Sequence, residues 1–263
     1  MPNLSIITIN YNNLAGLQKT IQSVFEQSFE DFEYIIIDGG SIDGSKEYIE
    51  KYGDKLTYWV SEKDAGVYNG MNKGIKKATG IYSLFLNSGD YFNDNTVVES
   101  LIKNSEGKDI VYGDIIYKDE YNEHTVVSPD VLSLQYLFNN TIPHPCTLIH
   151  KRLFDLIGPY NESINICADW AFFLDSIIKD NATYKHINKI ITTYSLGGIS
   201  SQPNSQALVE AERLNYLRSN YPLVLDEYNK LLLLEQKFNL LQKSRAINFL
   251  QKIFPGLKHA LTN

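Results

Sequence analysis

The sequence predicts an α/β protein with a mostly parallel sheet flanked by helices. Over roughly the first 100 residues, short apolar runs typical of buried strands alternate with segments whose apolar residues recur at helical spacing. This alternation is the pattern of βαβ units, which form parallel sheets. From Ile110 onward, strand-like segments follow one another as in a hairpin or meander, so we expect the sheet to become mixed. The 263 residues suffice for one large domain, or for one domain with an extension.

Each expected element rests on its own local signal. Strands are expected at 5–9, 34–37, 56–60, 81–86, 110–117, 123–127 and 183–194, with a further short strand ending at 150. Helices are expected at 14–25, around 45–49, and at 66–78, 94–102, 131–138, 152–157 and 169–179, with a helical pattern from about 204 onward. We place one boundary near Tyr221-Pro222, between a main domain, residues 1–220, and a C-terminal helical extension, residues 221–263.

Three glycines, Gly66, Gly70 and Gly74, fall within the helix expected at 66–78. A glycine in a helix interior costs roughly 1 kcal/mol relative to alanine. Glycines at that cost indicate the close approach of a ligand or of another backbone.

Polar residues follow three of the predicted strands at the point where each strand ends. The three junctions read Ile9-Asn10-Tyr11-Asn12-Asn13, Ile37-Asp38-Gly39-Gly40-Ser41 and Leu86-Asn87-Ser88-Gly89-Asp90. In open α/β sheets, ligands bind beyond the carboxyl ends of the strands. We therefore expect one shared polar pocket, in which Asp90 is the natural contact for a metal ion or a phosphate.

Composition excludes several classes of protein. A hydrophobic content of 43% and a charged content of 21% are typical of a globular protein, and the net charge of -7 argues against broad nucleic-acid binding. The two cysteines, Cys146 and Cys167, have neither a zinc spacing nor a CxxC spacing, so we expect two reduced core thiols. The N-terminus lacks the basic region of a signal peptide, and no apolar run reaches the ~20 residues that span a bilayer. We expect a cytoplasmic protein.

Taken together, these motifs resemble those of the family 2 glycosyltransferases with the GT-A (Rossmann-like) fold, especially bacterial members that assemble polysaccharides. Residues 5–12 look like the first nucleotide-binding strand of that family, and residues 35–45 are similar to its second. Residues 64–75 and 85–90 closely match one branch of the family. The resemblance extends from residue 3 to about residue 200. It implies an inverting hexosyltransferase that moves a sugar from a nucleotide-sugar donor, expected to be a UDP-sugar, to a hydroxyl of a saccharide or lipid-linked saccharide in cell-surface polysaccharide synthesis.

The resemblance implies a set of donor-binding residues at the strand ends. Asp38 would accept a hydrogen bond from uracil, although it could instead cap the glycine turn that follows it. Asp64, Asn72 and Lys73 could reach the ribose, the diphosphate or the donor sugar, and Lys73 equally suits a solvated helix face. The remaining donor-binding residues are Thr8, Asn10, Asn87 and Ser88.

Asp90 is expected to bind a divalent cation, Mn²⁺ or Mg²⁺, that bridges the donor diphosphate. The family's usual Asp-x-Asp motif reads Asn87-Ser88-Gly89-Asp90 here, so only one carboxylate remains. The Asn87 oxygen, a water or His144 could complete the ligand set. Metal dependence is therefore open, and so is a purely structural role for Asp90.

Asp169, in Ala168-Asp169-Trp170, matches the family's catalytic base, although the acidic residue that usually precedes it is absent. It could also cap its helix, and both roles are compatible. His144 lies between two prolines and could face the diphosphate or the acceptor, or be structural. Asp114 could contact the acceptor. The glycine-rich loop at 197–200 suits a segment that closes over both substrates.

Other readings of the sequence remain. A nucleotidyltransferase that makes nucleotide sugars would share the strand-loop arrangement, but it usually has a basic glycine-rich loop where this chain has Asn10-Tyr11-Asn12-Asn13. A non-catalytic nucleotide-sugar-binding module is consistent with the incomplete acidic motif. From Lys237 to the end the chain has five basic residues and no acidic one. The segment 231–261 could thus lie on the inner face of the cytoplasmic membrane, or pack against the main domain or a dimer partner.

Overall fold

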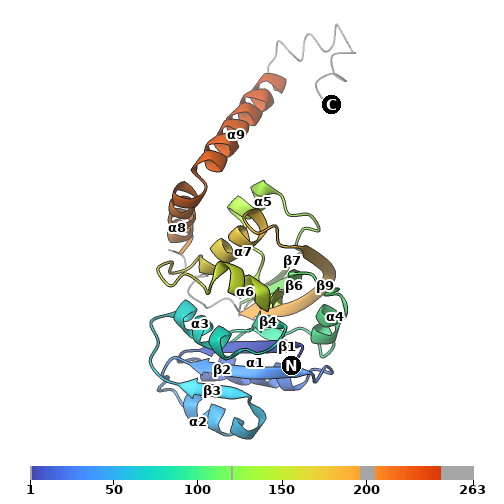
Figure 1. Cartoon of the computed structure of the whole chain (residues 1–263), viewed down its shortest axis with the longest axis vertical. Coiled ribbons are helices and arrows are strands. Elements are labelled where there is room, and N and C mark those ends of the chain that lie inside the picture. Colours follow the sequence, from blue (N-terminus) through green and yellow to red (C-terminus); the bar gives the residue numbers. More distant parts are fainter. Residues whose placement is uncertain (1, 120, 196–204, 244–263) are drawn as a thin grey trace. The chain divides into compact units, whose positions relative to one another are not determined.

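The structure, a computed structural model, describes residues 2–119, 121–195 and 205–243 (Figure 1). The chain divides into two compact units, residues 1–212 and 213–263. The boundary expected near residue 221 falls between α8 (Ser205–Asn220) and α9 (Pro222–Gln242). The glycine-rich loop expected at 197–200 lies outside the described residues.

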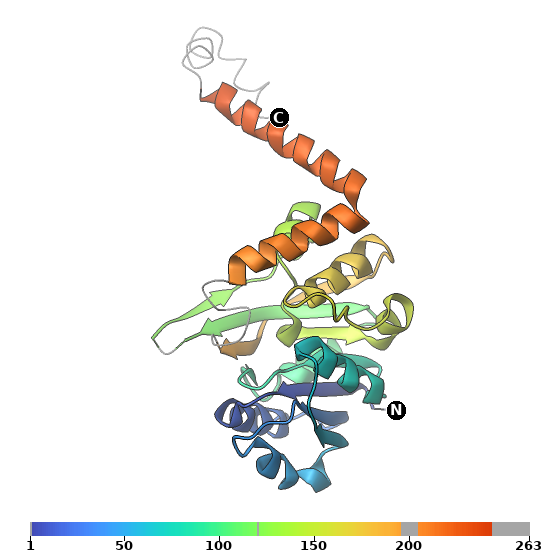
Figure 2. The same cartoon turned by 90° about the vertical axis from the view of Figure 1, so that its left-hand side faces the viewer.

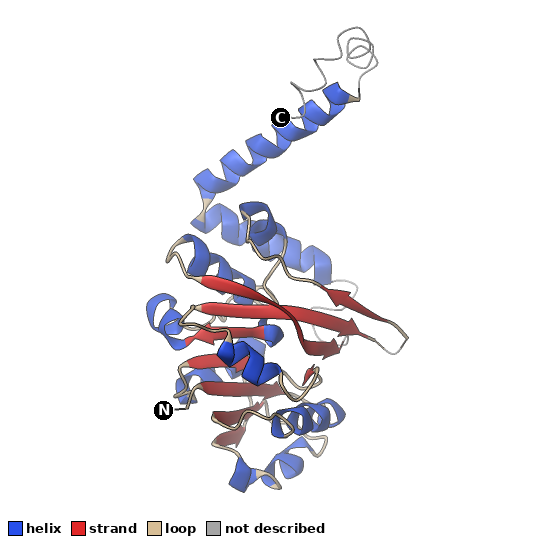
Figure 3. Ribbon diagram, turned by 90° about the vertical axis from the view of Figure 1, so that its right-hand side faces the viewer, coloured by secondary structure: helices blue, strands red, loops and turns tan. Residues whose placement is uncertain are grey.

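The first unit contains one nine-stranded sheet within its described residues (Figure 3). Its parallel part has the order β3-β2-β1-β4 and confirms the predicted βαβ pattern. The strands are β1 (Leu4–Asn10), β2 (Phe32–Asp38), β3 (Tyr58–Ser61) and β4 (Tyr82–Phe85), and the connecting helices are α1 (Leu14–Phe25), α2 (Ser45–Glu50) and α3 (Val67–Lys77). Every residue of β1 is buried, because helices cover both faces of the sheet.

The second half makes the sheet mixed, as predicted. β8 (Thr147–His150) runs antiparallel to β4 and to β6 (Ile110–Lys118), and β9 (Tyr184–Ser195) runs parallel to β6. β7 (Glu123–Val126) forms a hairpin with β6, drawn in green in Figure 2. A two-residue strand, β5 (Tyr91–Phe92), pairs with β9 and has no clear sequence signal.

Two apolar clusters hold helices against opposite faces of the sheet. Residues of α1, α2 and α4 (Val97–Lys103) share one cluster with Ile6 of β1, and residues of α3, α6 (Lys151–Ile157) and α7 (Ala168–Ile178) share the other with Ile7. Adjacent strand residues point to opposite faces, so Ile6 and Ile7 belong to different clusters. The short helix α5 (Leu134–Asn139) is tied to α7 by a hydrogen bond of 2.6 Å from Trp170 Nε1 to the Leu137 carbonyl.

Two glycines let α3 lie close to β1. A Cβ atom at Gly74 would lie 2.5 Å from Ile7 Cγ2, and one at Gly70 would lie 2.9 Å from Ile9 Cγ2. The close neighbours at these two positions are therefore strand side chains. Gly66 precedes the helix with φ of 122°, and a Cβ there would have no neighbour within 4 Å among the residues that the structure describes. It serves the backbone conformation, which favours glycine.

In the second unit, α9 carries many exposed apolar side chains. They are Leu223, Leu231, Leu233, Leu234, Phe238, Leu240 and Leu241. None of the described helices has the length and apolar character needed to cross a bilayer. Residues of the expected membrane or dimer segment beyond 243 lie outside the described part of the chain.

Candidate active site

The carboxyl ends of β1 and β2 are directly paired, with Asn10 beside Asp38. The Asp38 carboxylate is fully buried. Its Oδ1 accepts hydrogen bonds from Asn10 Nδ2 at 2.7 Å and Ser41 Oγ at 2.6 Å. Its Oδ2 accepts from the Ser41 N–H at 3.0 Å and from Ser61 Oγ at 2.6 Å. A nucleobase could contact this carboxylate only by competing with one of these four donors.

Burial raises the pKa of Asp38, but the hydrogen bonds from Ser41, Ser61 and Asn10 outweigh burial and hold the pKa below its ordinary value. The carboxylate is therefore ionised at neutral pH. It also orients Asn10, because the amide nitrogen of Asn10 must face it.

Asn10 consequently presents its carbonyl oxygen to the other side. This Oδ1 atom is buried and has no hydrogen-bond partner among the residues that the structure describes. A buried acceptor left unpaired costs about 1–3 kcal/mol. A donor group of a ligand could supply the missing hydrogen bond. Thr8 differs: its fully buried Oγ1 donates to the Leu86 carbonyl at 2.8 Å, so this side chain joins strands inside the sheet.

The three polar residues before and within α3 have separate environments. Asp64 accepts from the Gly66 N–H at 3.1 Å, and its Oδ2 lies so close to Gly39 that a Cβ there would be 2.7 Å away. Lys73 forms an ion pair with Glu62 at 2.8 Å on the rim of the site. Asn72 is buried and holds the backbone of Tyr160 through both ends of its amide, each at 2.9 Å. Asn72 thus anchors the loop that leads toward α7.

Asp90 lies at the end of β4 in a tightly held turn. Thr20 Oγ1 donates to its carbonyl at 2.7 Å, and Ser195 Oγ donates to the Gly89 carbonyl at 2.7 Å. Asp90 is 4% exposed, and its carboxyl group accepts a long bond of 3.4 Å from the Ser195 N–H. Burial raises the pKa of Asp90 to about 7, and the charge of His144 and the Ser195 N–H oppose that rise only in part. A cation beside Asp90 would favour its ionised form.

A continuous chain of polar contacts links this turn to Asp169. Asn87 Nδ2 lies 3.3 Å from His144 Nε2, and His144 Nδ1 lies 3.1 Å from Asp169 Oδ2. On the other side, the Tyr68 hydroxyl donates to Asp169 Oδ1 at 2.9 Å. The structure therefore brings together four side chains that are far apart in sequence. Three of these, Asn87, His144 and Asp169, are predicted site residues.

Asp169 lies in the first turn of α7, after an N-cap at Cys167. Burial raises its pKa, but hydrogen bonding to His144, the charge of His144 and the Tyr68 hydroxyl lower it, so that the pKa lies below its ordinary value. The carboxylate is thus ionised at neutral pH. Tyr68, His144 and the Trp170 N–H supply three hydrogen bonds to the two oxygens, which leaves one lone pair for a further donor such as an acceptor hydroxyl.

The residues around Asp90 fit a divalent cation that takes part of its ligands from substrate and water. Asn87 Oδ1 is buried and has no hydrogen-bond partner among the described residues, and it stands on the same turn as the Asp90 carboxyl. Within the described ranges no three His, Cys, Asp or Glu side chains form a cluster that could hold a metal by themselves. Mg²⁺ is commonly held by one or two carboxylates together with substrate phosphates and waters. One carboxylate and one amide oxygen satisfy that pattern, whereas the two ring nitrogens of His144 already contact Asp169 and Asn87.

Asp114 lies in a different polar cluster. It is buried, and its Oδ1 accepts from the Ser128 N–H at 2.9 Å and contacts His186 Nε2 at 2.9 Å. The other nitrogen of His186 lies 2.7 Å from Asp130. An acceptor contact by Asp114 stays a prediction.

Several residues that shape the site have little or no sequence signal. Tyr68 lies within the matched motif at 64–75 and could have been selected there. Ser61, Thr20 and Ser195 reach the site only through tertiary contacts. Ser88 lies at the β4 end, where its carbonyl accepts from Asn13 Nδ2 at 2.9 Å.

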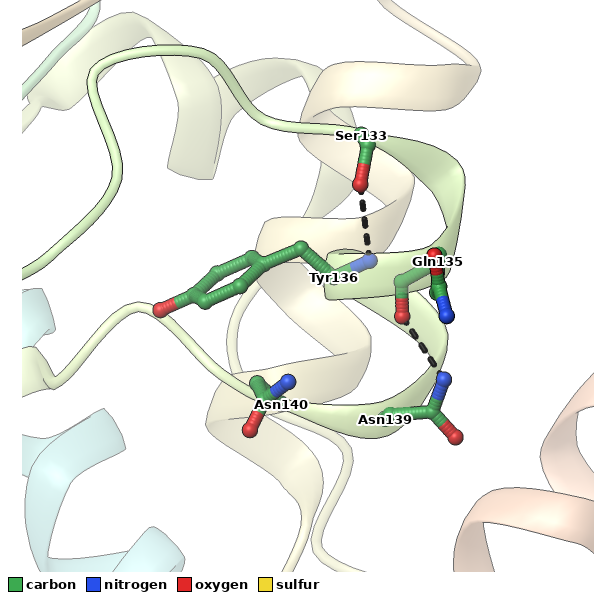
Figure 4. A pocket seen from close by; sticks show the side chains of 5 residues that line it. All are labelled: Ser133, Gln135, Tyr136, Asn139 and Asn140. Atoms are coloured by element: carbon green, nitrogen blue, oxygen red, sulfur yellow. Dashed lines mark hydrogen bonds between the residues drawn. The ribbon is translucent and has the colours of Figure 1, made fainter. Parts of the chain in front are cut away.

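A separate shallow hollow of about 440 Å³ lies on α5 (Figure 4). It is lined by uncharged polar residues, namely Ser133, Gln135, Tyr136, Asn139 and Asn140. Ser133 Oγ accepts from the Tyr136 N–H at 3.0 Å, and so caps the helix. No residue of the strand-end site lines this hollow.

Comparison with known proteins places this geometry in context. Residues 5–178 match the family model described as Glycosyl transferase family 2. A PGL/p-HBAD biosynthesis glycosyltransferase of Mycobacterium bovis is 32% identical over 208 residues, which are 76% of this chain and 80% of the relative.

Two solved structures share the fold. S. aureus TarS 1–349 in complex with UDP-GlcNAc has a TM-score of 0.62 at 18% identity, covering 82% of this chain and 73% of that one. The mannosyltransferase PcManGT from Pyrobaculum calidifontis, in complex with GDP-Man and Mn²⁺, has a TM-score of 0.60 at 13% identity, covering 82% and 62%.

Proposed function

Because the chain belongs to glycosyl transferase family 2 and has the GT-A fold, we propose that it is an inverting hexosyltransferase. Its donor is a nucleotide sugar of the UDP class, and its acceptor is a hydroxyl of a saccharide or lipid-linked saccharide in cell-surface polysaccharide synthesis. The observation that carries this proposal is the chain of contacts Asn87–His144–Asp169–Tyr68, which joins the Asp90 turn to an ionised carboxylate.

The donor base is bound at the paired ends of β1 and β2. Asn10 Oδ1 accepts a hydrogen bond from an N–H of the base, because it is a buried acceptor without a partner among the described residues. Asp38 orients Asn10 and the turn at 38–41. It contacts the base itself when the hydroxyl of Ser41 or Ser61 releases its hydrogen bond to the carboxylate. Asp64 and Lys73 reach the ribose or the diphosphate, and Asn72 acts through the loop it anchors. The UDP-GlcNAc bound to TarS supports a uridine donor.

The diphosphate lies beside the Asp90 turn. Asp90 and Asn87 Oδ1 would hold a divalent cation, and Ser88 lies on the same turn. When bound, Mn²⁺ or Mg²⁺ would neutralise the charge that develops on the departing nucleoside diphosphate. The Mn²⁺ in PcManGT supports this assignment.

Asp169 acts as the general base. The acceptor hydroxyl gives its proton to Asp169 while its oxygen forms a bond to the anomeric carbon. The bond from that carbon to the diphosphate oxygen breaks, and UDP leaves with the electron pair. Attack opposite to the leaving group inverts the anomeric configuration. His144 and Tyr68 hold the carboxylate in place, each through one oxygen.

The test is a panel of UDP-sugars incubated with the full chain and Mn²⁺ or Mg²⁺, scored by UDP release and sugar transfer. Asp169→Asn should lower kcat about 100- to 10,000-fold while donor binding, measured by calorimetry, is retained. Asp155→Asn, an exposed aspartate on α6, is the matched control and should leave kcat unchanged. Full turnover by Asp169→Asn would show that another group is the base.

A non-catalytic binding module is the second candidate. It is favoured by the single carboxylate at the position where the family usually has two. UDP binding without release of UDP from any donor, at any acceptor tested, would support it.

We also propose a cytoplasmic protein that meets a membrane-bound acceptor or a second copy through α9. The exposed leucines of α9 are the support. Co-sedimentation with anionic vesicles and light scattering distinguish the two arrangements.

A further inference from the structure

The turn before α7 is held by a residue from another helix. Cys167, the N-cap of α7, makes no capping bond through its side chain. The Glu212 carboxylate of α8 lies against this turn instead. Its Oε1 accepts from the Asn165 N–H at 2.9 Å and from Asn165 Nδ2 at 3.0 Å. Its Oε2 accepts from the Ile166 N–H at 3.0 Å and from the Cys167 N–H at 3.2 Å.

Three successive backbone N–H groups thus converge on one side chain. Such an arrangement fixes the path of the chain more firmly than a single capping bond, because the two oxygens and four donors constrain both position and rotation. The negative charge also lies beside the positive end of the α7 dipole. One turn earlier on α8, the Val209 carbonyl accepts from Cys167 Sγ at 3.7 Å.

This turn shares a proton donor with Asp169. The Tyr68 hydroxyl lies 2.5 Å from the Ile166 carbonyl oxygen and 2.9 Å from Asp169 Oδ1. A hydroxyl has one proton, so the two acceptors compete for it. The position of the Ile166 carbonyl therefore affects how Tyr68 contacts Asp169. Glu212 sets that position, because it accepts from the N–H groups of Ile166 and Cys167, the two residues that flank the Ile166 carbonyl.

We propose that Glu212 is a positioning residue for Asp169: it holds the 165–167 turn so that Tyr68 and Asp169 keep the geometry needed for proton removal from the acceptor. The inference rests on the proposed function, since it assigns no chemistry to Glu212 itself. It predicts that Glu212 affects the chemical step rather than donor binding, because its contacts lie at the base and not at the strand ends that bind the nucleotide.

The experiment compares Glu212→Ala, Glu212→Gln and Glu212→Asp in the full chain. Glu212→Ala and Glu212→Gln should lower kcat about 10- to 100-fold, the range expected for a small displacement of a catalytic group, with the donor KM changed less than about threefold. Glu212→Asp retains the charge and both oxygens and should recover part of the lost kcat. The matched control is Glu210→Ala on the same helix, because Glu210 is exposed and contacts Gln206.

A double-mutant cycle with Tyr68→Phe distinguishes positioning from general destabilisation. If Glu212 acts through Tyr68 and Asp169, the double variant should lose little more kcat than the more impaired single variant. The inference would be refuted if the loss of kcat in the double variant equalled the product of the losses in the two single variants. It would also be refuted if Glu212→Ala had the same kcat as Glu210→Ala. If Glu212→Ala does not fold, the Gln and Asp variants decide the same question. The proposed function fails separately, when Asp169→Asn retains full turnover.

Discussion

Asp90, which we propose to hold the cation, also carries a cost in stability, and Asp90→Asn separates the two. The carboxyl has a pKa of about 7 in the folded protein, compared with 3.8 for an ordinary aspartate. The two pKa values differ by about 3, and a difference of one corresponds to roughly 1.4 kcal/mol. The ionised carboxyl therefore lowers the free energy of unfolding by about 4 kcal/mol. The folded state holds the proton more tightly than the unfolded state. The free energy of unfolding therefore falls as pH rises from near 4 to near 7, and the full cost is present above pH 7.

Asparagine has nearly the same shape and no charge. In EDTA at pH 8, Asp90→Asn should therefore raise the free energy of unfolding, by up to about 4 kcal/mol, in urea titrations followed by circular dichroism. Near pH 4 the gain should disappear. Addition of Mn²⁺ should stabilise the wild-type protein but not the variant, and the variant should lose metal-dependent UDP release.

The control is Asp155→Asn, which removes one exposed charge and should change the free energy of unfolding by less than about 0.5 kcal/mol. If Asp90→Asn destabilises the metal-free protein at pH 8, then the buried carboxylate is not costly in the folded state. That outcome would contradict the reasoning about the site, whatever its effect on turnover.

Three further predictions concern β1 and the residues around it. Asn10→Ala should raise the donor KM about 10-fold with little change in kcat, since it removes one hydrogen bond to the base; an unchanged KM in steady-state kinetics would argue against that contact. Glu33 accepts hydrogen bonds from Ser5, Thr79 and Gly80. Burial raises the pKa of Glu33, but these bonds hold the pKa below its ordinary value. The stability that the ionised Glu33 contributes to the fold is therefore present above pH 4.5 and is lost as pH falls through the folded-state pKa. Glu33→Gln should thus cost about 2 kcal/mol at pH 7 and less at pH 3, measured by urea unfolding. Gly74→Ala should lower the free energy of unfolding by about 1–3 kcal/mol, because the new Cβ would lie 2.5 Å from Ile7 Cγ2. This loss is expected despite the better helix propensity of alanine. A variant as stable as the wild-type protein, or more stable, would show that α3 can shift at no cost.

Much of the proposed donor site could be predicted because it depends on local order. A buried strand that ends in Asn10, Asp38 or Asn87 delivers that residue to the same edge of a parallel sheet. The pairing of Asn10 with Asp38 follows from this alternation of strands and helices. The burial of Thr8, two residues before Asn10, was harder to predict. Its hydroxyl donates to the carbonyl of Leu86, which directly follows β4, and this bond forms only when β1 and β4 are neighbours.

The mostly parallel α/β sheet, the polar strand ends and the family resemblance follow from the amino-acid sequence, because strand and helix periodicity and short motifs are local properties of the chain. Which of those polar groups remain available to a ligand depends on the packing of distant segments. Asp38 is saturated by Asn10 Nδ2, Ser41 and Ser61, whereas Asn10 Oδ1 and Asn87 Oδ1 have no partner among the described residues. Tyr68 and Asp169 lie 101 residues apart, and Glu212 lies 45 to 47 residues from the turn it holds. Such contacts depend on how helices pack against the sheet, and hydrogen-bond capacity in a buried site is set by those neighbours rather than by residue type alone.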